Sequence, residues 1–89
     1  MEGIKNIVRR YILDRHLAGE PSDQLKDDTP LQTSGILDSL AVLELASYIG
    51  EQFGIELSFA DTTVERFDSL EQIAAAIARR RLEAERKAS

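Results

Sequence analysis

The stretch Gly35-Ile36-Leu37-Asp38-Ser39-Leu40 decides the fold of this chain, because it runs straight into an amphipathic segment that ends near Phe53. Apolar residues in that segment recur three, four or seven positions apart, which places them on one face of a helix. Gly54 follows, and glycine commonly occupies the position just past a helix end. The sequence therefore predicts a helix over 39–53 that begins at a serine. Its buried stripe is Val42, Leu45, Ala46, Ile49 and Phe53.

Two further apolar stripes predict helices on either side of this segment. The first predicts a helix over 3–17, and Gly19 and Pro21 end it. The last predicts a helix over 69–80, with Asp68 as the N-cap and Glu71 closing a capping box. A short helix is expected over 61–66. The fold class is therefore all-α, a small bundle of three long helices plus one short helix. The stripes are Ile4, Ile7, Val8, Tyr11 and Ile12 in the first helix, and Leu70, Ile73, Ala74 and Ile77 in the last.

The remaining segments are a long connection and a polar tail. Residues 18–38 form the connection, and loops this long inside a compact domain are often functional. Four apolar residues are expected to hold it on the core. Residues 81–89 are charged and are expected to fray. With 89 residues, the chain forms a single domain over 1–89. The four apolar residues of the loop are Leu25, Leu31, Ile36 and Leu37.

Composition excludes several classes of function. The formal net charge is −5, from 16 acidic and 11 basic residues, which is a poor match for nucleic acid. The chain has no cysteine and a lone histidine, His16, so we expect no metal site and no catalytic site. The N-terminal segment carries charges without an apolar run, so it is neither a signal peptide nor a membrane span. We therefore expect a cytoplasmic location.

The tripeptide Asp-Ser-Leu occurs twice, at 38–40 and at 68–70, so its context must distinguish the two copies. The second copy has the pattern of a helix cap. The first has no Glu or Gln placed to close a capping box. A serine at a helix start has a free hydroxyl, and the helix-terminal N–H groups nearby favour anionic groups. Ser39 is therefore the candidate acceptor for a phosphodiester-linked group.

These residues resemble the acyl carrier protein family, which includes acyl, aminoacyl and peptidyl carriers. The resemblance covers roughly residues 4–78 and is most specific over 35–53, where Gly35-x-Leu37-Asp38-Ser39 is followed by Leu43-Glu44-Leu45 and Phe53-Gly54-Ile55. It implies that a phosphopantetheinyl transferase moves 4′-phosphopantetheine from coenzyme A onto Ser39, with Asp38 beside the attachment point. The chain would then be a monomeric carrier, not an enzyme, that holds an acyl or aminoacyl group as a thioester.

The resemblance also implies a surface for partner enzymes on the serine's side of the second helix. Leu40 and Leu43 lie there beside the core stripe, and an exposed apolar strip indicates a docking surface. The charged residues of the same face are expected to meet basic groups on partners, although an ordinary solvated face explains them equally well. The expected partner-binding residues are Leu40, Leu43, Glu44, Ser47 and Glu51.

The second helix departs from the strongly acidic pattern of fatty-acid synthesis carriers. Ala41 and Gly50 stand where acids are common, and Ser47 replaces a larger apolar residue. The segment is more similar to D-alanyl and small aminoacyl carriers that are loaded by a separate activating ligase and unloaded by downstream biosynthetic enzymes. A polyketide-type carrier is almost as well supported, and a fatty-acid carrier is a further alternative. A different class remains open as well, an unmodified helical protein-interaction module that needs no Ser39 hydroxyl.

Overall fold

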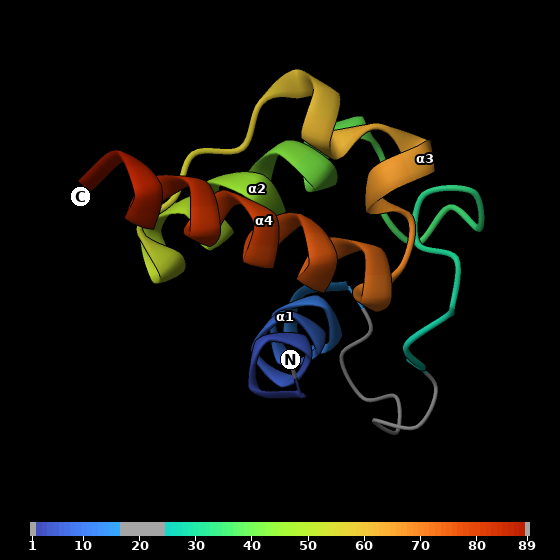
Figure 1. Ribbon diagram of the computed structural model, residues 1–89. Coiled ribbons are helices and arrows are strands. Elements are labelled where there is room, and N and C mark those ends of the chain that lie inside the picture. The colour runs from blue at the N-terminus through green and yellow to red at the C-terminus, as the bar shows by residue number, and fades with distance from the viewer. Residues whose placement is uncertain (1, 17–24, 89) are drawn as a thin grey trace.

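The computed structural model describes residues 2–16 and 25–88, and three long helices form its body (Figure 1). These are α1 (Glu2–His16), α2 (Ser39–Phe53) and α4 (Leu70–Ala88). Two short pieces join α2 to α4, the 3₁₀ helix η2 (Phe59–Thr62) and α3 (Val64–Phe67). α4 packs against α1, α2 and α3, and it crosses α1 at a steep angle (Figure 1). Since no strand occurs within the described ranges, the predicted all-α bundle is confirmed.

Helix α1 contributes one apolar face to the core and fastens the loop that follows. Val8, Tyr11 and Ile12 are buried, as the periodicity predicts. Ile7 was placed in the same stripe, but 39% of it is exposed, so it lies at the edge of the core. The side chains of Lys5 and Arg9 on α1 both form ion pairs with Asp27 in the loop.

The loop between α1 and α2 was predicted over 18–38, and residues 17–24 lie outside the described part of the chain. In the part that is described, Leu25, Leu31 and Leu37 are fully buried, and Ile36 is partly buried against the core. These four residues hold the loop on the bundle, as expected from the sequence. The loop reaches α4 as well, because the N–H of Glu71 donates to the carbonyl of Asp27.

Two glycines, Gly50 in the last turn of α2 and Gly54 just past it, allow the chain to turn back sharply at the end of the helix. Gly54, just past the helix, has φ 64° and ψ 37°, in the left-handed region that glycine adopts without strain. The N–H groups of Gly54 and Ile55 both donate to the carbonyl of Gly50, the first as in an αL motif and the second as the longer bond of a Schellman motif. A side chain at position 50 would bring its Cβ within 3.0 Å of the Ile55 carbonyl oxygen. Glycine at 50 is therefore what allows this close return.

The single short helix predicted over 61–66 is replaced by two shorter pieces. Thr63 separates η2 from α3 with an extended backbone, φ −69° and ψ 160°. The carboxylate of Asp61 explains the tight 3₁₀ turn, because it accepts hydrogen bonds from the N–H and the hydroxyl of Ser58. Phe67, the last residue of α3, is fully buried and fixes this region on the core.

The helix predicted over 69–80 is present from Leu70 onward. It continues to Ala88, so the prediction of a frayed tail over 81–89 is wrong for residues 81–88, and Ser89 lies outside the described residues. Arg79 and Arg80 form ion pairs with the buried carboxylate of Asp61, and Arg80 also pairs with Glu83. The charge of the tail predicts fraying, but alanine, leucine, arginine, lysine and glutamate are all strong helix formers.

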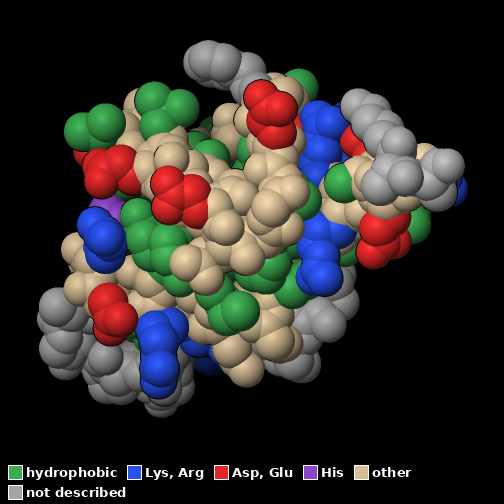
Figure 2. Space-filling view, turned by 90° about the vertical axis from the view of Figure 1, so that its left-hand side faces the viewer, with side chains coloured by type: hydrophobic (Ala, Val, Ile, Leu, Met, Phe, Trp, Pro, Cys, Tyr) green, Lys and Arg blue, Asp and Glu red, His purple; other side chains and the backbone are tan. Residues whose placement is uncertain are grey.

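Positive and negative side chains are interspersed with hydrophobic ones on the face of the molecule shown in Figure 2.

Candidate functional site

The start of α2 is built around the carboxylate of Asp38. Its backbone is extended, with φ −87° and ψ −177°, and its side chain accepts a hydrogen bond of 2.8 Å from the N–H of Ala41. The N–H of Val42 donates to its carbonyl at 2.9 Å. Asp38 is therefore the N-cap, and it leaves the next residue, Ser39, as the first residue of the helix.

Ser39 is exposed, and its hydroxyl has no hydrogen-bond partner among the described residues. The cap position is already filled by Asp38, so the helix does not need this hydroxyl. The first turn of α2 contains no acidic residue, and a helix N-terminus favours negative charge. A phosphodiester on the Ser39 oxygen would therefore lie in open solvent at the positive end of the helix, beside the Asp38 carboxylate that caps it. The side chains present fit a covalently attached phosphate group.

The approach to Ser39 is held by short-range hydrogen bonds within the loop. Gly35 has φ 87°, a left-handed conformation, and its N–H donates to the carbonyl of Gln32 in a tight turn. The N–H of Leu37 donates to the carbonyl of Leu31 at 2.9 Å. Both leucine side chains are buried. The backbone that leads into the Asp-Ser-Leu motif is therefore fixed on the core two residues before the serine.

The second Asp-Ser-Leu copy is occupied by structural contacts. The hydroxyl of Ser69 accepts from the N–H of Gln72 at 3.2 Å, and the Gln72 side chain accepts from the N–H of Asp68 at 2.6 Å. The cap of α4 therefore lies one residue later than the Asp68 and Glu71 pair predicted from the sequence. Asp and Ser are both good caps, so their adjacency leaves the register ambiguous from sequence alone.

The carboxylate of Asp68 is engaged elsewhere, with the loop that precedes Ser39. Burial alone would raise the pKa of this carboxyl, but the N–H and hydroxyl of Thr33, together with the N–H groups of Gln32 and Leu31, outweigh it and lower the pKa from its usual value. Asp68 is therefore ionised at neutral pH. These contacts cross more than thirty positions of sequence, which is why local patterns gave no sign of them.

An exposed apolar strip lies on α2 beside Ser39. The exposed fractions of Leu40 and Leu43 are 65% and 54%, which agrees with their predicted position outside the core stripe. Val64, at the start of α3, is also 45% exposed, and the sequence analysis did not single it out. No signal in the sequence indicated this exposure, because Val64 precedes the buried Phe67 by three positions and that spacing predicts burial on the same face. The polar residues predicted for this surface are all exposed as well: Glu44, Ser47 and Glu51.

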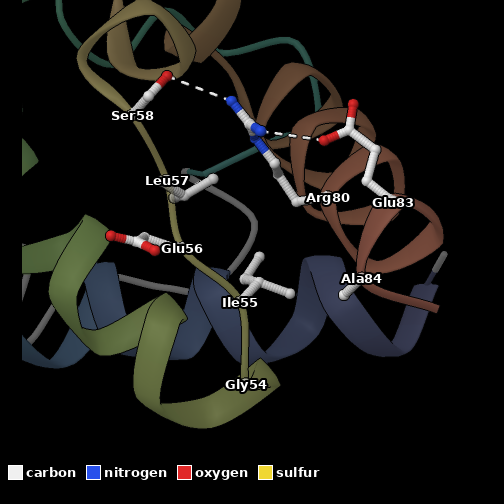
Figure 3. Close-up of a pocket in the computed structure, with 8 residues that line it drawn as sticks. All are labelled: Gly54, Ile55, Glu56, Leu57, Ser58, Arg80, Glu83 and Ala84. Carbon is white, nitrogen blue, oxygen red and sulfur yellow. Dashed lines mark hydrogen bonds and ion pairs between the residues drawn. The ribbon is translucent and has the colours of Figure 1, made fainter. Parts of the chain in front are cut away.

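A pocket of about 640 Å³ lies at the opposite end of α2 (Figure 3). Ile55 and Leu57 point toward α4, where Ala84 completes the apolar lining (Figure 3). Arg80 spans the polar end, where it contacts Ser58 and Glu83 (Figure 3). Since α2 has 15 residues at about 1.5 Å each, Ser39 lies roughly 20 Å from this pocket. The pocket is not part of the serine site.

Other kinds of site find no support within residues 2–16 and 25–88. No group of three or more histidine and carboxylate side chains is placed to hold a metal ion. His16 is exposed in the last turn of α1. None of the helices described is both long and apolar enough to span a membrane.

Comparison with known proteins identifies the family. The family model described as the phosphopantetheine attachment site matches residues 13–77, which is well over half of the chain. A comparison with curated proteins found no match. The resemblance drawn from the motif around Ser39 is therefore confirmed. Domains of this family are generally carriers without catalytic activity, and they work with phosphopantetheinyl transferases and acyl-handling enzymes. The chain belongs to the phosphopantetheine-attachment family of acyl and peptidyl carrier proteins, whose cofactor is covalently bound 4′-phosphopantetheine.

Proposed function

We propose that Ser39 is the residue that carries the phosphopantetheine. The observation that supports it is the contrast between the two Asp-Ser-Leu copies. The hydroxyl of Ser39 is exposed and without a described partner, whereas that of Ser69 is half-buried and accepts a hydrogen bond from Gln72. Only the first copy offers a nucleophilic oxygen to another protein without loss of a helix cap.

The chain's own residues prepare this oxygen but do not activate it. Asp38 caps the helix with its carboxylate and so orients the first turn from which the Ser39 hydroxyl projects. No histidine is near in sequence, and His16 is exposed on α1, so the base that removes the hydroxyl proton is assigned to the transferase. Transfer forms a phosphoester bond at Oγ of Ser39 and breaks the pyrophosphate bond of coenzyme A, with adenosine 3′,5′-bisphosphate as the leaving group and the hydroxyl proton passed to the base of the transferase. The attached group supplies a thiol, which this cysteine-free chain lacks, to hold acyl or aminoacyl cargo as a thioester.

The docking surface in this proposal consists of the exposed strip beside Ser39. Leu40 and Leu43 on α2 give it apolar area, and the exposed Val64 on α3 is a further apolar residue that a partner could reach. Exposed leucine and valine side chains of this kind favour burial against a partner. Glu44, Ser47 and Glu51 would form its polar rim, where charges affect the rate of association more than the affinity.

The composition of α2 supports partners outside bulk fatty-acid synthesis. Its first turn has no acidic residue. Ala41, where an acid is common in fatty-acid carriers, is only 5% exposed, so a carboxylate there would be poorly solvated. An acid in place of Gly50 would bring its Cβ to 3.0 Å from the Ile55 carbonyl oxygen, which is a tight contact. We infer a stand-alone carrier of amino-acid or specialised acyl groups, loaded by an activating ligase and unloaded by downstream biosynthetic enzymes. A fatty-acid carrier remains the alternative for the same site.

The experiment compares the wild type with Ser39→Ala and Ser69→Ala. Each protein is incubated with coenzyme A, Mg²⁺ and a phosphopantetheinyl transferase of broad specificity, and its intact mass is measured. The wild type and Ser69→Ala should each gain one phosphopantetheine group, and Ser39→Ala should gain none. The reverse pattern would overturn the assignment to Ser39. With the holo-protein in hand, release of AMP by candidate amino-acid and acyl ligases tests the cargo class.

A further inference from the structure

We propose that Asp68 is a positioning residue for the modification site, because it holds the loop that leads into Ser39 in a fixed relation to α3. This inference rests on the proposed role of Ser39. It gives the second Asp-Ser-Leu copy a function beyond the start of α4. The argument comes from the contacts of its carboxylate, which reach across the chain to the loop and leave the helix cap to other residues.

Four hydrogen bonds converge on the Asp68 carboxylate from three consecutive residues. Oδ1 accepts from the backbone N–H groups of Leu31, Gln32 and Thr33, at 3.1, 2.6 and 3.0 Å. Oδ2 accepts from the hydroxyl of Thr33 at 2.9 Å. The Asp68 carbonyl accepts a further bond, 2.6 Å long, from the N–H of Leu31. Hydrogen bonds to a charged acceptor are among the stronger ones in proteins, so this contact fixes the loop firmly.

The hydrogen bonds of Asp68 affect the position of Ser39 through the loop between them. The carbonyl of Leu31, whose N–H is held by Asp68, accepts from the N–H of Leu37 at 2.9 Å. Leu31 and Leu37 are both buried, so neither can shift without disturbing the core. Leu37 is followed by the N-cap Asp38 and then by Ser39. The path from Asp68 to the modification site therefore involves only two hydrogen-bonded steps and two residues of chain.

The same contact fixes α3 beside the loop. Asp68 directly follows Phe67, the buried last residue of α3. The side chain of Gln32 donates to the carbonyls of Phe67 at 3.0 Å and Thr62 at 3.3 Å. The exposed Val64 on α3 is thereby held in register with the loop that presents Ser39. A partner that contacts both would meet a single preformed surface.

Helix capping does not account for the Asp68 carboxylate. The start of α4 is capped by Ser69 and Gln72, and the start of α2 is capped by Asp38. Removal of the Asp68 carboxylate therefore leaves both caps in place. The substitution acts specifically on Leu31, Gln32 and Thr33, which lose their hydrogen bonds to the carboxylate. A positioning role of Asp68 can therefore be distinguished from a general role in helix stability.

The test measures the kinetics of phosphopantetheine transfer to Asp68→Ala, Asp68→Asn and a control, Asp61→Asn. Asp61 is a buried, hydrogen-bonded carboxylate that pairs with Arg79 and Arg80 of α4 and not with residues 31–33, so the control removes a carboxylate that stabilises the fold and leaves the hydrogen bonds between Asp68 and the loop in place. We expect Asp68→Ala to raise the KM for the carrier about tenfold with kcat little changed, since the docking surface is displaced while the hydroxyl is intact. Asp68→Asn retains an acceptor for the three N–H groups and should stay near the wild type. Asp61→Asn should keep the wild-type KM.

Amide hydrogen exchange provides the second readout. In Asp68→Ala, the amides of residues 31–33 and of Leu37 should exchange faster, while those of 42–53 in α2 stay protected. A wild-type KM together with fast exchange in the loop would overturn the positioning role, and unchanged exchange would overturn the anchoring itself. If Asp68→Ala does not fold, Thr33→Val replaces it, because this variant removes only one of the four hydrogen bonds to the Asp68 carboxylate. We expect Thr33→Val to raise the KM by less than Asp68→Ala would. A KM equal to that of the wild type would overturn the proposal. Absence of modification in the wild type would instead refute the role of Ser39, on which this inference depends.

Discussion

Replacement of Asp61 by asparagine removes the buried charge that holds the middle of α4 against η2. The Asp61 side chain is only 2% exposed, and it forms ion pairs with Arg79 at 3.0 Å and Arg80 at 2.7 Å. Burial by itself would raise the pKa of this carboxyl. The hydrogen bond from the N–H of Ser58, those from the side chains of Arg80 and Ser58, and the charge of Arg80 outweigh it and lower the pKa from 3.8 to about 2.

This shift fixes both the size and the sign of the effect. A carboxyl with a lower pKa in the folded state stabilises the fold above its unfolded pKa, near 3.8, and loses that contribution as the pH falls toward about 2. The change corresponds to about 2 kcal/mol at neutral pH. Asparagine can keep an oxygen toward Ser58, so the substitution removes the charge and leaves the turn of η2 its acceptor.

Urea unfolding followed by far-ultraviolet circular dichroism measures this contribution directly. We expect Asp61→Asn to be less stable than the wild type by about 2 kcal/mol at neutral pH, and the difference to shrink toward zero as the pH falls through 3.8 to about 2. Glu83→Gln is the matched control, because it removes a partner of Arg80 that is 46% exposed, and it should cost less than about 1 kcal/mol. A difference between the wild type and Asp61→Asn that stays constant with pH would refute the argument.

Three further substitutions and one control test local features. Gly50→Ala should destabilise the fold by about 1–2 kcal/mol in the urea assay, because its Cβ would lie 3.0 Å from the Ile55 carbonyl oxygen. The control is Gly3→Ala, which has open space around it and should be neutral or stabilise the fold by up to about 1 kcal/mol. Asp38→Ala should cost about 0.5–2 kcal/mol through loss of the α2 cap, and thermal melts would contradict this if the midpoint did not move. Leu40→Asp should change the free energy of unfolding by no more than about 0.5 kcal/mol, since the side chain is 65% exposed. The same substitution should raise the KM of a phosphopantetheinyl transferase for this chain. An unchanged KM would show that Leu40 is not part of the docking surface.

Hydrophobic periodicity was sufficient to predict the three long helices and most of the core. Val42, Leu45 and Ile49 are buried as their spacing indicates, and Leu40 and Leu43 are exposed as theirs does. These outcomes follow from the period of the helix, which is a local property of the sequence. The exposure of Ser39 at the start of α2 could be predicted for the same reason.

The features that sequence analysis missed depend on contacts between distant segments. The carboxylate of Asp68 binds backbone groups more than thirty positions away, and no local pattern specifies which N–H groups a loop will bring to it. The pairing of Arg79 and Arg80 with Asp61 is equally remote in sequence. The extension of α4 to Ala88 is the exception, because it reflects the helix propensity of residues 81–88, which is a local property. The role of Gly50 depends on the return of the chain over the end of α2, which places the Ile55 carbonyl oxygen 3.0 Å from the position of a Cβ at residue 50.

The most direct test of the central claim is site-resolved mass spectrometry of the wild-type chain after incubation with coenzyme A, Mg²⁺ and a phosphopantetheinyl transferase. Proteolysis gives peptides that contain Ser39 and Ser69 separately. We predict one phosphopantetheine group per chain, located on Ser39, and the same location in Ser69→Ala. Modification of Ser69, or no modification of a chain whose circular dichroism spectrum is that of a folded helical protein, would contradict the account.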